Sequence, residues 1–148
     1  MSISYFVQGD LPRLRVPKQM PPDFADGLWK HTCFEAFLAR AGSSEYRELN
    51  FSPAGQWAAY HFDSYRQGMR PLELATPPRV TVRQARGLLE LEALVRLPPA
   101  GTGLVKLALC AVVEEESGTL HYWAARHPAG KPDFHHPEGY ILELTGRS

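Results

Sequence analysis

Hydrophobic and polar residues alternate along several short stretches of the chain, the pattern of a half-buried β-strand. The odd positions of 89–97 are all apolar, while Glu90, Glu92 and Arg96 lie between them. A helical repeat fits this stretch less well, because it would place Glu92 on the apolar face. Alternation also runs through 104–114, where the intervening positions are largely apolar. We therefore expect 104–114 to be a central strand that is covered on both sides.

Turn sequences separate the alternating stretches. Residues 52–55 (Ser-Pro-Ala-Gly) have proline and glycine where a type I turn places them, and 84–87 and 115–118 each end in the glycine that a hairpin favours. Proline-rich loops are expected at 12–22 and 71–78, and one helical turn within 63–69. The predicted strands are 3–8, 31–39, 45–52, 56–63, 79–85, 88–97, 104–114, 119–126 and 139–145. About nine such strands predict an all-β fold, an antiparallel β-sandwich of the jelly-roll or immunoglobulin-like kind. With no internal repeat or linker, we expect residues 1–148 to form a single domain.

Composition narrows the classes of partner. The 148 residues include 16 Lys and Arg and 16 Asp and Glu, so the formal net charge is zero. This balance argues against nucleic-acid binding through a broad basic surface and against a polybasic membrane anchor. Cys33 and Cys110 both lie in apolar stretches, which favours small buried residues and leaves a disulfide as the alternative. The start of the chain resembles no signal peptide and no run of 18 apolar residues occurs, so we expect a cytoplasmic protein without a membrane segment.

The segment 45–69 contains the richest set of candidate ligand-binding residues. If its two strands alternate strictly, Leu49, Phe51, Ala58, Tyr60 and Phe62 face the core. The opposite face would then carry Glu48, Asn50, Trp57, His61 and Asp63. An aromatic ring beside carboxylate, amide and imidazole groups suits a sugar, whose apolar face stacks on the ring while its hydroxyls take the hydrogen bonds. The alternative is that Trp57 packs under a loop and the polar groups are solvated.

The segment 121–136 holds four of the six histidines, at 121, 127, 135 and 136, together with Asp133. Three interpretations are open: a metal site, a polar loop ordered by its own hydrogen bonds, or a loop that contacts a ligand. Without an HExxH or CxxC pair to fix the ligand geometry, we predict no metal site. Trp123, directly before the loop, is a core residue or lines the same cleft.

A third cluster, His31, Cys33 and Glu35, falls on one face of the strand predicted at 31–39. Side chains two residues apart on a strand lie roughly 6–7 Å apart, which is too far for a direct nucleophile–base hydrogen bond. Since the sequence also lacks a glycine elbow, a Walker loop and GxGxxG, we predict no catalytic residues. The alternative role for Glu35 is a partly buried ion pair with an arginine of a neighbouring strand.

Three motifs in order resemble the bacterial DOMON-like ligand-binding domains and, more distantly, family 9 carbohydrate-binding modules. They are 28-LWKHTCFEAFLA-39, 46-YRELNFSPAGQWAAYHFDSYRQGM-69 and 127-HPAGKPDFHH-136. The resemblance implies a β-sandwich that binds a small ligand without chemistry; members of the wider superfamily bind sugars or haem. Such domains usually have further chain before the first strand seen here, so we expect an open sheet edge. Because zero net charge also favours self-association, a homodimer is expected.

These observations favour a non-catalytic domain that binds a small ligand, a carbohydrate or glycoconjugate. We expect Trp57 and Trp123 to be stacking platforms, with His61 beside the first. Glu48, Asn50 and Asp133 would accept hydrogen bonds from hydroxyls, while Arg66 and His127 would donate them. The two alternatives are a haem-binding electron-transfer domain, with Met69 and His61 as candidate iron ligands, and a protein–protein interaction module.

Overall fold

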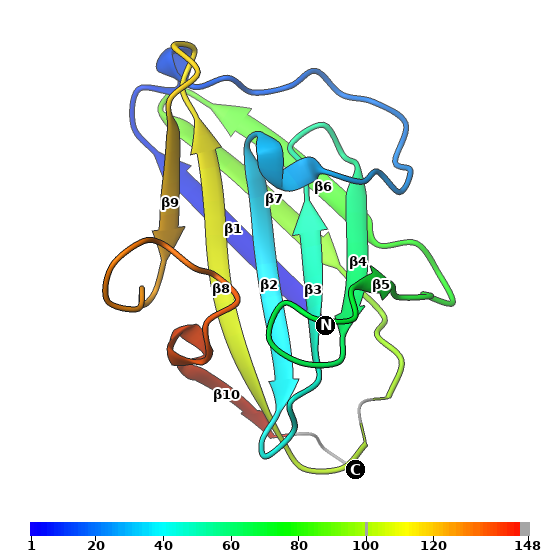
Figure 1. The fold of residues 1–148 in the computed structure, drawn as a ribbon. Helices are drawn as coiled ribbons and strands as arrows, with labels where there is room; N and C mark the ends of the chain where they lie inside the picture. The colour runs from blue at the N-terminus through cyan, green and yellow to red at the C-terminus, as the bar shows by residue number, and fades with distance from the viewer. Residues whose placement is uncertain (100, 146–148) are drawn as a thin grey trace.

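The computed structural model describes residues 1–99 and 101–145, and in them ten strands form two antiparallel sheets. The smaller sheet has three strands in the order β1-β7-β6 and lies behind the larger one in Figure 1. Its strands are β1 (Ser2–Gln8), β6 (Arg79–Ala85) and β7 (Leu88–Leu94). The predicted all-β sandwich is therefore confirmed, and β1 forms an edge of the smaller sheet.

The larger sheet has the strand order β10-β8-β2-β3-β4-β5, with β9 pairing with β8 beside β10 (Figure 1). Its strands are β2 (Cys33–Arg40), β3 (Tyr46–Phe51), β4 (Trp57–Phe62), β5 (Arg70–Pro71), β8 (Leu104–Glu114), β9 (Leu120–Ala124) and β10 (Leu142–Thr145). The long strand β8 pairs with β2 over eight residues and is central, as the sequence predicts. It is covered on both sides, because Leu107 packs between the sheets and Cys110 packs on the outer face.

All nine predicted strands are present, with ends that differ by a few residues, and the short β5 is an addition at the start of the expected loop 71–78. The helical turn expected within 63–69 is wrong. Gln67 N donates instead to the Ser64 carbonyl oxygen at 2.9 Å in a tight turn. Arg66 (φ 55°) and Gly68 (φ 71°) adopt the left-handed backbone conformation, which a right-handed helix excludes. Single turns of 3₁₀-helix occur at η1 (Leu11–Arg13), η2 (Leu28–Lys30) and η3 (Pro137–Gly139).

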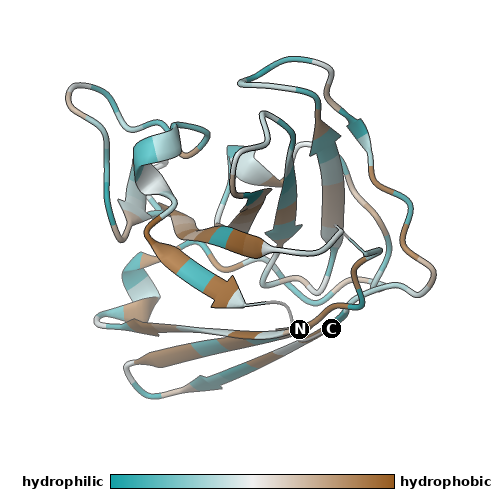
Figure 2. Cartoon of the chain, turned by 90° about the horizontal axis from the view of Figure 1, so that it is seen from below, coloured by the Kyte–Doolittle hydropathy of each residue, from teal (hydrophilic) through white to brown (hydrophobic). Residues whose placement is uncertain are grey.

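The main core lies between the two sheets, which form separate layers when viewed from below (Figure 2). The smaller sheet contributes the alternating apolar side of 89–95, and the larger sheet contributes alternate residues of β2 and β3. The fully buried members include Phe34, Ala36, Leu49, Phe51, Leu89 and Leu91. Because the sheets cover each other on one side only, the large sheet has an outer face as well.

A second hydrophobic cluster, the outer-face cluster, covers that other side of the large sheet. Its buried residues are Phe37, Tyr46, Ala58, Tyr60, Phe62, Ala108 and Cys110. Leu28 and Trp29 of η2 pack against it, as do Phe134 and Tyr140 from the segment that follows β9. Figure 1 shows both segments in front of the large sheet. The outer face is thus partly covered by loops rather than by a third layer.

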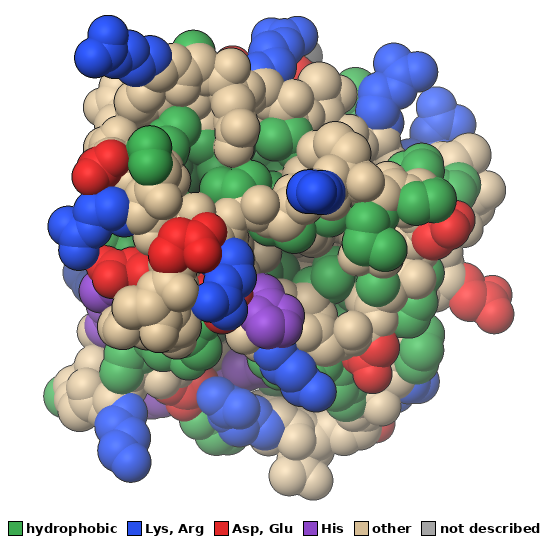
Figure 3. Space-filling view, turned by 90° about the horizontal axis from the view of Figure 1, so that it is seen from above, with side chains coloured by type: hydrophobic (Ala, Val, Ile, Leu, Met, Phe, Trp, Pro, Cys, Tyr) green, Lys and Arg blue, Asp and Glu red, His purple; other side chains and the backbone are tan. Residues whose placement is uncertain are grey.

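The end of the sandwich that carries the β8–β9 hairpin has acidic, basic and histidine side chains side by side (Figure 3). Arg15 Nη1 lies 2.9 Å from Glu114 Oε1, and His31 Nδ1 lies 2.8 Å from Glu114 Oε2. His121 Nε2 lies 3.0 Å from Glu115 Oε1. Arg15 and Glu114 are therefore a pair of opposite charges within the zero net total.

Cys33 and Cys110 are both buried and free. The expectation of small buried residues is confirmed, and they form no disulfide with each other. Within residues 1–99 and 101–145, no helix has the length and apolar character needed to cross a membrane.

Candidate functional site

The register of the β3–β4 hairpin decides which polar residues share a face. Glu48 pairs with Tyr60, and Phe51 pairs with Trp57. Even-numbered residues of both strands therefore face one side of the sheet, and odd-numbered residues face the other. The cause is a three-residue loop, 53–55, in which Ser52 pairs with Gln56 and Gly55 has φ 93°. Glycine suits this left-handed position, as in hairpins that combine a type I turn with a bulge. The predicted face assignment, which requires a register shifted by one residue, is therefore wrong.

Trp57 and His61 consequently lie on the side of the sheet opposite to Glu48 and Asn50. Trp57 packs against the main core and meets the Phe24 ring edge-on at 5.6 Å between centroids. The loop around Phe24 bridges to the Trp57 backbone. The alternative interpretation, that Trp57 packs under a loop, is thus confirmed. The accompanying expectation that the polar groups are solvated is wrong for Glu48 and Asn50, which are both buried.

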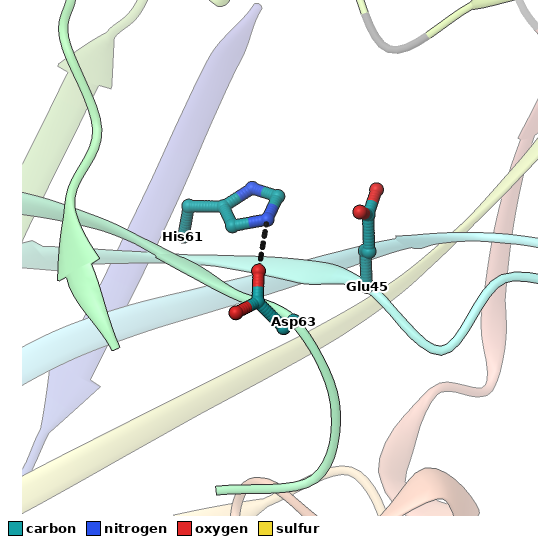
Figure 4. Close-up of side chains that lie close together, drawn as sticks. All are labelled: Glu45, His61 and Asp63. Atoms are coloured by element: carbon teal, nitrogen blue, oxygen red, sulfur yellow. Dashed lines mark ion pairs between the residues drawn. The ribbon is translucent and has the colours of Figure 1, made fainter. Parts of the chain in front are cut away.

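His61 belongs to a separate cluster with Glu45 and Asp63, shown in Figure 4. His61 Nε2 lies 3.5 Å from Asp63 Oδ1, and the donor atoms of all three residues lie within 4.8 Å of one another. A divalent cation could be held by such a set in principle. Arg70 Nη1 already lies 2.7 Å from Asp63 Oδ1 and holds the pKa of that carboxyl below its usual value. We therefore interpret the cluster as an ion-pair network.

The candidate site is a cavity of about 370 Å³ on the outer face of the large sheet. Its lining comes from β2, β3, β4, β8 and β9 and from the loops at 66–69 and 132–135. Aromatic and acidic groups predominate among the lining residues, which are Trp29, Glu35, Glu48, Phe62, Arg66, Met69, Val112, Tyr122, Pro132, Asp133, Phe134 and His135. This volume and this mixture of apolar walls with a few polar groups are typical of small-ligand sites.

The floor of the cavity consists of two buried carboxyl groups, and an amide is buried beside them without lining the cavity. Glu35 of β2 lies directly opposite Asn50 of β3, and Glu48 is two residues away on the same face. Asn50 Nδ2 donates to Glu48 Oε1 at 3.0 Å. Burial raises the pKa of Glu48 to about 7, and burial together with the Glu48 charge raises that of Glu35 well above its usual value. The floor therefore holds protons near neutral pH when no ligand is bound.

The rim of the cavity is an ion pair held by two loops. Arg66 Nη2 donates to Asp133 Oδ1 at 2.7 Å, and the Tyr65 hydroxyl donates to Asp133 Oδ2. Partial burial opposes ionisation of Asp133, but these two donors hold its pKa below the usual value. Asp133 also accepts from the backbone N–H groups of His135 and His136. The loop after β9 is thus ordered by hydrogen bonds, as one of its three interpretations predicts, and it also lines the cavity, while contact with a ligand stays a prediction.

His135 connects the rim to the floor. The Tyr46 hydroxyl oxygen accepts from Arg66 N at 3.1 Å and lies 2.7 Å from His135 Nδ1, so its hydrogen is free to be donated to the imidazole. Burial, first, and then the Arg66 charge lower the pKa of His135 to about 4. The other ring nitrogen, Nε2, lies 3.8 Å from Glu48 Oε2. His135 is therefore an uncharged member of the site at neutral pH.

The remaining sequence candidates lie away from the cavity. Trp123 is 65% exposed and pairs with Ala111, whose side chain faces the main core, whereas its neighbour Tyr122 faces the cavity. His127 is exposed and stacks with the Phe134 ring at 6.2 Å. Of the eight predicted binding residues, the structure brings Glu48, Asn50, Arg66 and Asp133 together. It does not bring Trp57, His61, Trp123 or His127 to the same place.

The other chemical clusters named from sequence separate as well. His31 binds Glu114 at the end of the sandwich, so it does not join Cys33 and Glu35. The predicted ion pair of Glu35 with an arginine is wrong, since Glu35 Oε1 is buried without a hydrogen-bond partner. Met69 lines the cavity, while His61 lines a different hollow of about 620 Å³. The two candidate haem ligands therefore do not face one site.

Several lining residues escaped the sequence analysis. Trp29 lies in the single turn η2 and Phe134 in a loop, and neither segment is long enough or regular enough for periodicity to indicate direction. Alternation in the strand predicted at 31–39 places Glu35 on the same face as Cys33 and Phe37. Its position opposite Asn50 depends in addition on the register between β2 and β3. Tyr122 is adjacent to Trp123, the residue that the sequence analysis predicts as a stacking platform. Strand alternation combined with the three-residue loop would have recovered the strand residues, but not the loop residues.

Comparison with known proteins supports the fold. No model of a known protein family matches the sequence, and no curated protein matches it. Among solved structures, the chain is similar to "a putative carbohydrate-binding protein from Bacteroides uniformis ATCC 8492". The TM-score is 0.59 at 11% sequence identity, and the match covers 94% of this chain and 68% of that one. At this identity the similarity establishes the sandwich fold alone.

Proposed function

We propose that the protein binds a carbohydrate or glycoconjugate in the outer-face cavity and does not transform it. The observation that carries the proposal is a floor of two buried carboxyl groups, Glu35 and Glu48, beneath aromatic walls. Sugar hydroxyls would donate to these acceptors, while the apolar face of the ring would pack against aromatic side chains. The structural neighbour, described as a carbohydrate-binding protein candidate, supports the same class of ligand.

The polar groups around the cavity have distinct roles in this proposal. Glu35 and Glu48 accept from ligand hydroxyls at the floor, Asn50 holds Glu48 in place, and Asp133 accepts at the rim. Arg66, which is exposed on one side, donates to a hydroxyl or to an acidic substituent. Trp29 and Tyr122 replace Trp57 and Trp123 as the stacking residues, because they line the cavity.

Adjacent residues of β9 provide a matched test of this site. We expect Tyr122→Ala to lower the affinity for a bound sugar roughly tenfold, about 1.4 kcal/mol, because an aromatic wall is lost. Trp123→Ala removes a larger and more exposed ring from the opposite face and is expected to change affinity less than twofold. Ligands would be found on a glycan array, and dissociation constants measured by calorimetry.

Two experimental outcomes would contradict the proposal. One is an absence of binding to every simple or array-bound glycan at millimolar concentration. The other is a greater loss of affinity with Trp123→Ala than with Tyr122→Ala. Since both side chains are exposed, neither variant is expected to unfold the protein.

A further inference from the structure

The floor of the cavity is acidic and is not neutralised by the basic residue nearest to it. Glu35 is 3% exposed and Glu48 is 4% exposed. Within the described part of the chain, Arg66 is the basic side chain that lines the cavity, and its Nη2 binds Asp133 at 2.7 Å. Buried carboxyl groups usually have an opposite charge in contact. In the free protein, protonation near neutral pH removes the charge instead, and a ligand that carries a positive charge would allow these carboxyls to ionise.

The floor also presents acceptors without donors. Glu35 Oε1 and Asn50 Oδ1 are buried, and neither atom has a hydrogen-bond partner. Asn50 Nδ2 already donates to Glu48 Oε1, so the amide has its carbonyl oxygen left over. Unpartnered buried acceptors are rare in folded proteins, and each costs free energy. A group that offers several donors could bind both carboxyl groups that line the cavity, Glu35 and Glu48.

Aromatic side chains surround this acidic floor. Trp29, Phe62, Tyr122 and Phe134 all line the same cavity. The faces of aromatic rings attract cations, and they do so more strongly where water is excluded. Aromatic walls above buried carboxyl groups therefore favour a positively charged group over a neutral one of the same size.

We propose that the cavity floor binds a protonated primary amine, and that the ligand is an amino sugar. An ammonium group has three donors and one positive charge, which suit the two carboxyl groups, Glu35 and Glu48, that line the floor without a basic partner. The inference rests on the proposed carbohydrate-binding function and names the kind of sugar. The aromatic walls and the rim would hold the sugar ring and its hydroxyls.

The protonation of the floor gives this inference a separate signature. In the free protein the floor holds protons near neutral pH, because burial raises the pKa of both Glu35 and Glu48. An ammonium ion stabilises the carboxylates and displaces those protons. The remaining groups around the floor are uncharged near pH 7, because burial raises the pKa of the thiols and phenols and lowers that of the imidazole. They are Cys33, Tyr46, Tyr60, Cys110, His135 and Tyr140.

Three disaccharides that differ only at carbon 2 test the proposal by calorimetry. They are the β-1,4-linked dimer of glucosamine, its N-acetylated form, and cellobiose. We expect the glucosamine dimer to bind at least tenfold more tightly than either neutral sugar at pH 6, where its amine is protonated. Titrations at pH 7 in two buffers of different ionisation enthalpy are expected to show proton release for the amino sugar and none for cellobiose.

Single substitutions test whether the floor carboxyls cause the preference for the amino sugar. Glu35→Gln keeps the shape of the side chain but removes its charge, and is expected to bring the three affinities within about threefold of one another. Glu48→Gln serves as a second variant if Glu35→Gln fails to fold, as judged by near-UV circular dichroism. Glu116→Gln is the control, because this carboxyl is 62% exposed at the far end of the sandwich. It is expected to leave the tenfold preference unchanged.

The possible failures can be told apart. Equal binding of the three sugars, weakened by Tyr122→Ala, overturns the amine inference and leaves the carbohydrate proposal standing. If no sugar binds but a simple amine such as cyclohexylamine does, the carbohydrate proposal is wrong and the cation preference of the floor stands. If neither sugars nor amines bind, both are wrong.

Discussion

Truncation of Phe37 to alanine is expected to lower the free energy of unfolding by about 3–5 kcal/mol. Phe37 is fully buried in the outer-face cluster, between the sheet and the loop that closes the cavity. Its ring meets His135 edge-on at 5.0 Å and Tyr46 at 6.4 Å between centroids. Alanine would leave a void beneath the imidazole as well as removing buried apolar surface. Urea denaturation measures the loss, and the melting temperature should fall by roughly 10 °C.

The same substitution is expected to change the site in a way that a general loss of stability would not. Water entering beside His135 would reduce the desolvation that lowers its pKa to about 4, so that the pKa rises toward 6.5. Phe34→Ala is the matched control, because Phe34 is the preceding residue of β2, is 1% exposed and faces the main core. It should cost similar stability and leave the His135 pKa, followed by NMR, unchanged. Equal pKa shifts in the two variants would contradict the placement of Phe37 beneath the site.

The fold was predictable because alternation in this chain is strong and local. Stretches such as 88–94 show one buried and one exposed side in both the sequence and the structure. The order of strands within the sheets was not predictable in the same way. β8 pairs with both β2 and β9, and no local pattern specifies that β2 lies next to a strand 70 residues later. The short β5 has two residues, too few for any periodicity.

The candidate site was predictable only in part, and a single residue explains much of the difference. Gly55 at positive φ makes the β3–β4 loop three residues long, and this sets Glu48 opposite Tyr60 rather than beside Trp57. A one-residue change in register moves every side chain of a strand to the other face. Trp29 comes from the short turn η2, and Phe134 and His135 come from a loop, and the approach of both segments to the sheet depends on tertiary contacts. The sequence therefore indicated several polar residues of the site, but it did not indicate the aromatic residues that line the cavity with them.

The dependence of stability on pH is expected to reveal the buried carboxyls directly. Glu48 has an ordinary pKa of 4.5 when exposed and a pKa of about 7 in the folded protein. Between these values the folded state binds more protons than the unfolded state, so stability falls as pH rises. At about 1.4 kcal/mol for each pH unit, this amounts to about 3 kcal/mol. Glu35, whose pKa is also raised by burial, acts in the same direction.

His135 acts in the opposite direction over nearly the same range. Its pKa falls from an ordinary 6.5 to about 4 in the folded protein. Between these values the unfolded state binds more protons, so this group makes stability rise with pH, by about 2 kcal/mol after allowance for its partial exposure. Asp63 and Asp133, whose pKa values are lowered, titrate below this range. Between pH 4.5 and 6.5 the wild-type protein, with two carboxyls against one imidazole, is therefore expected to lose stability with rising pH.

Two variants separate these contributions, and the slope against pH is the quantity compared. Glu48→Gln removes one of the two carboxyl groups that make stability fall as pH rises. It is expected to make stability nearly constant between pH 4.5 and 6.5. His135→Gln removes the rising contribution and is expected to make the fall steeper than in the wild type. Glu116→Gln, on an exposed carboxyl, should reproduce the wild-type slope. Urea denaturation at half-unit pH steps measures all four profiles. Parallel profiles for Glu48→Gln and the wild type would mean that the Glu48 carboxyl is solvated, and the buried acidic floor would then be wrong.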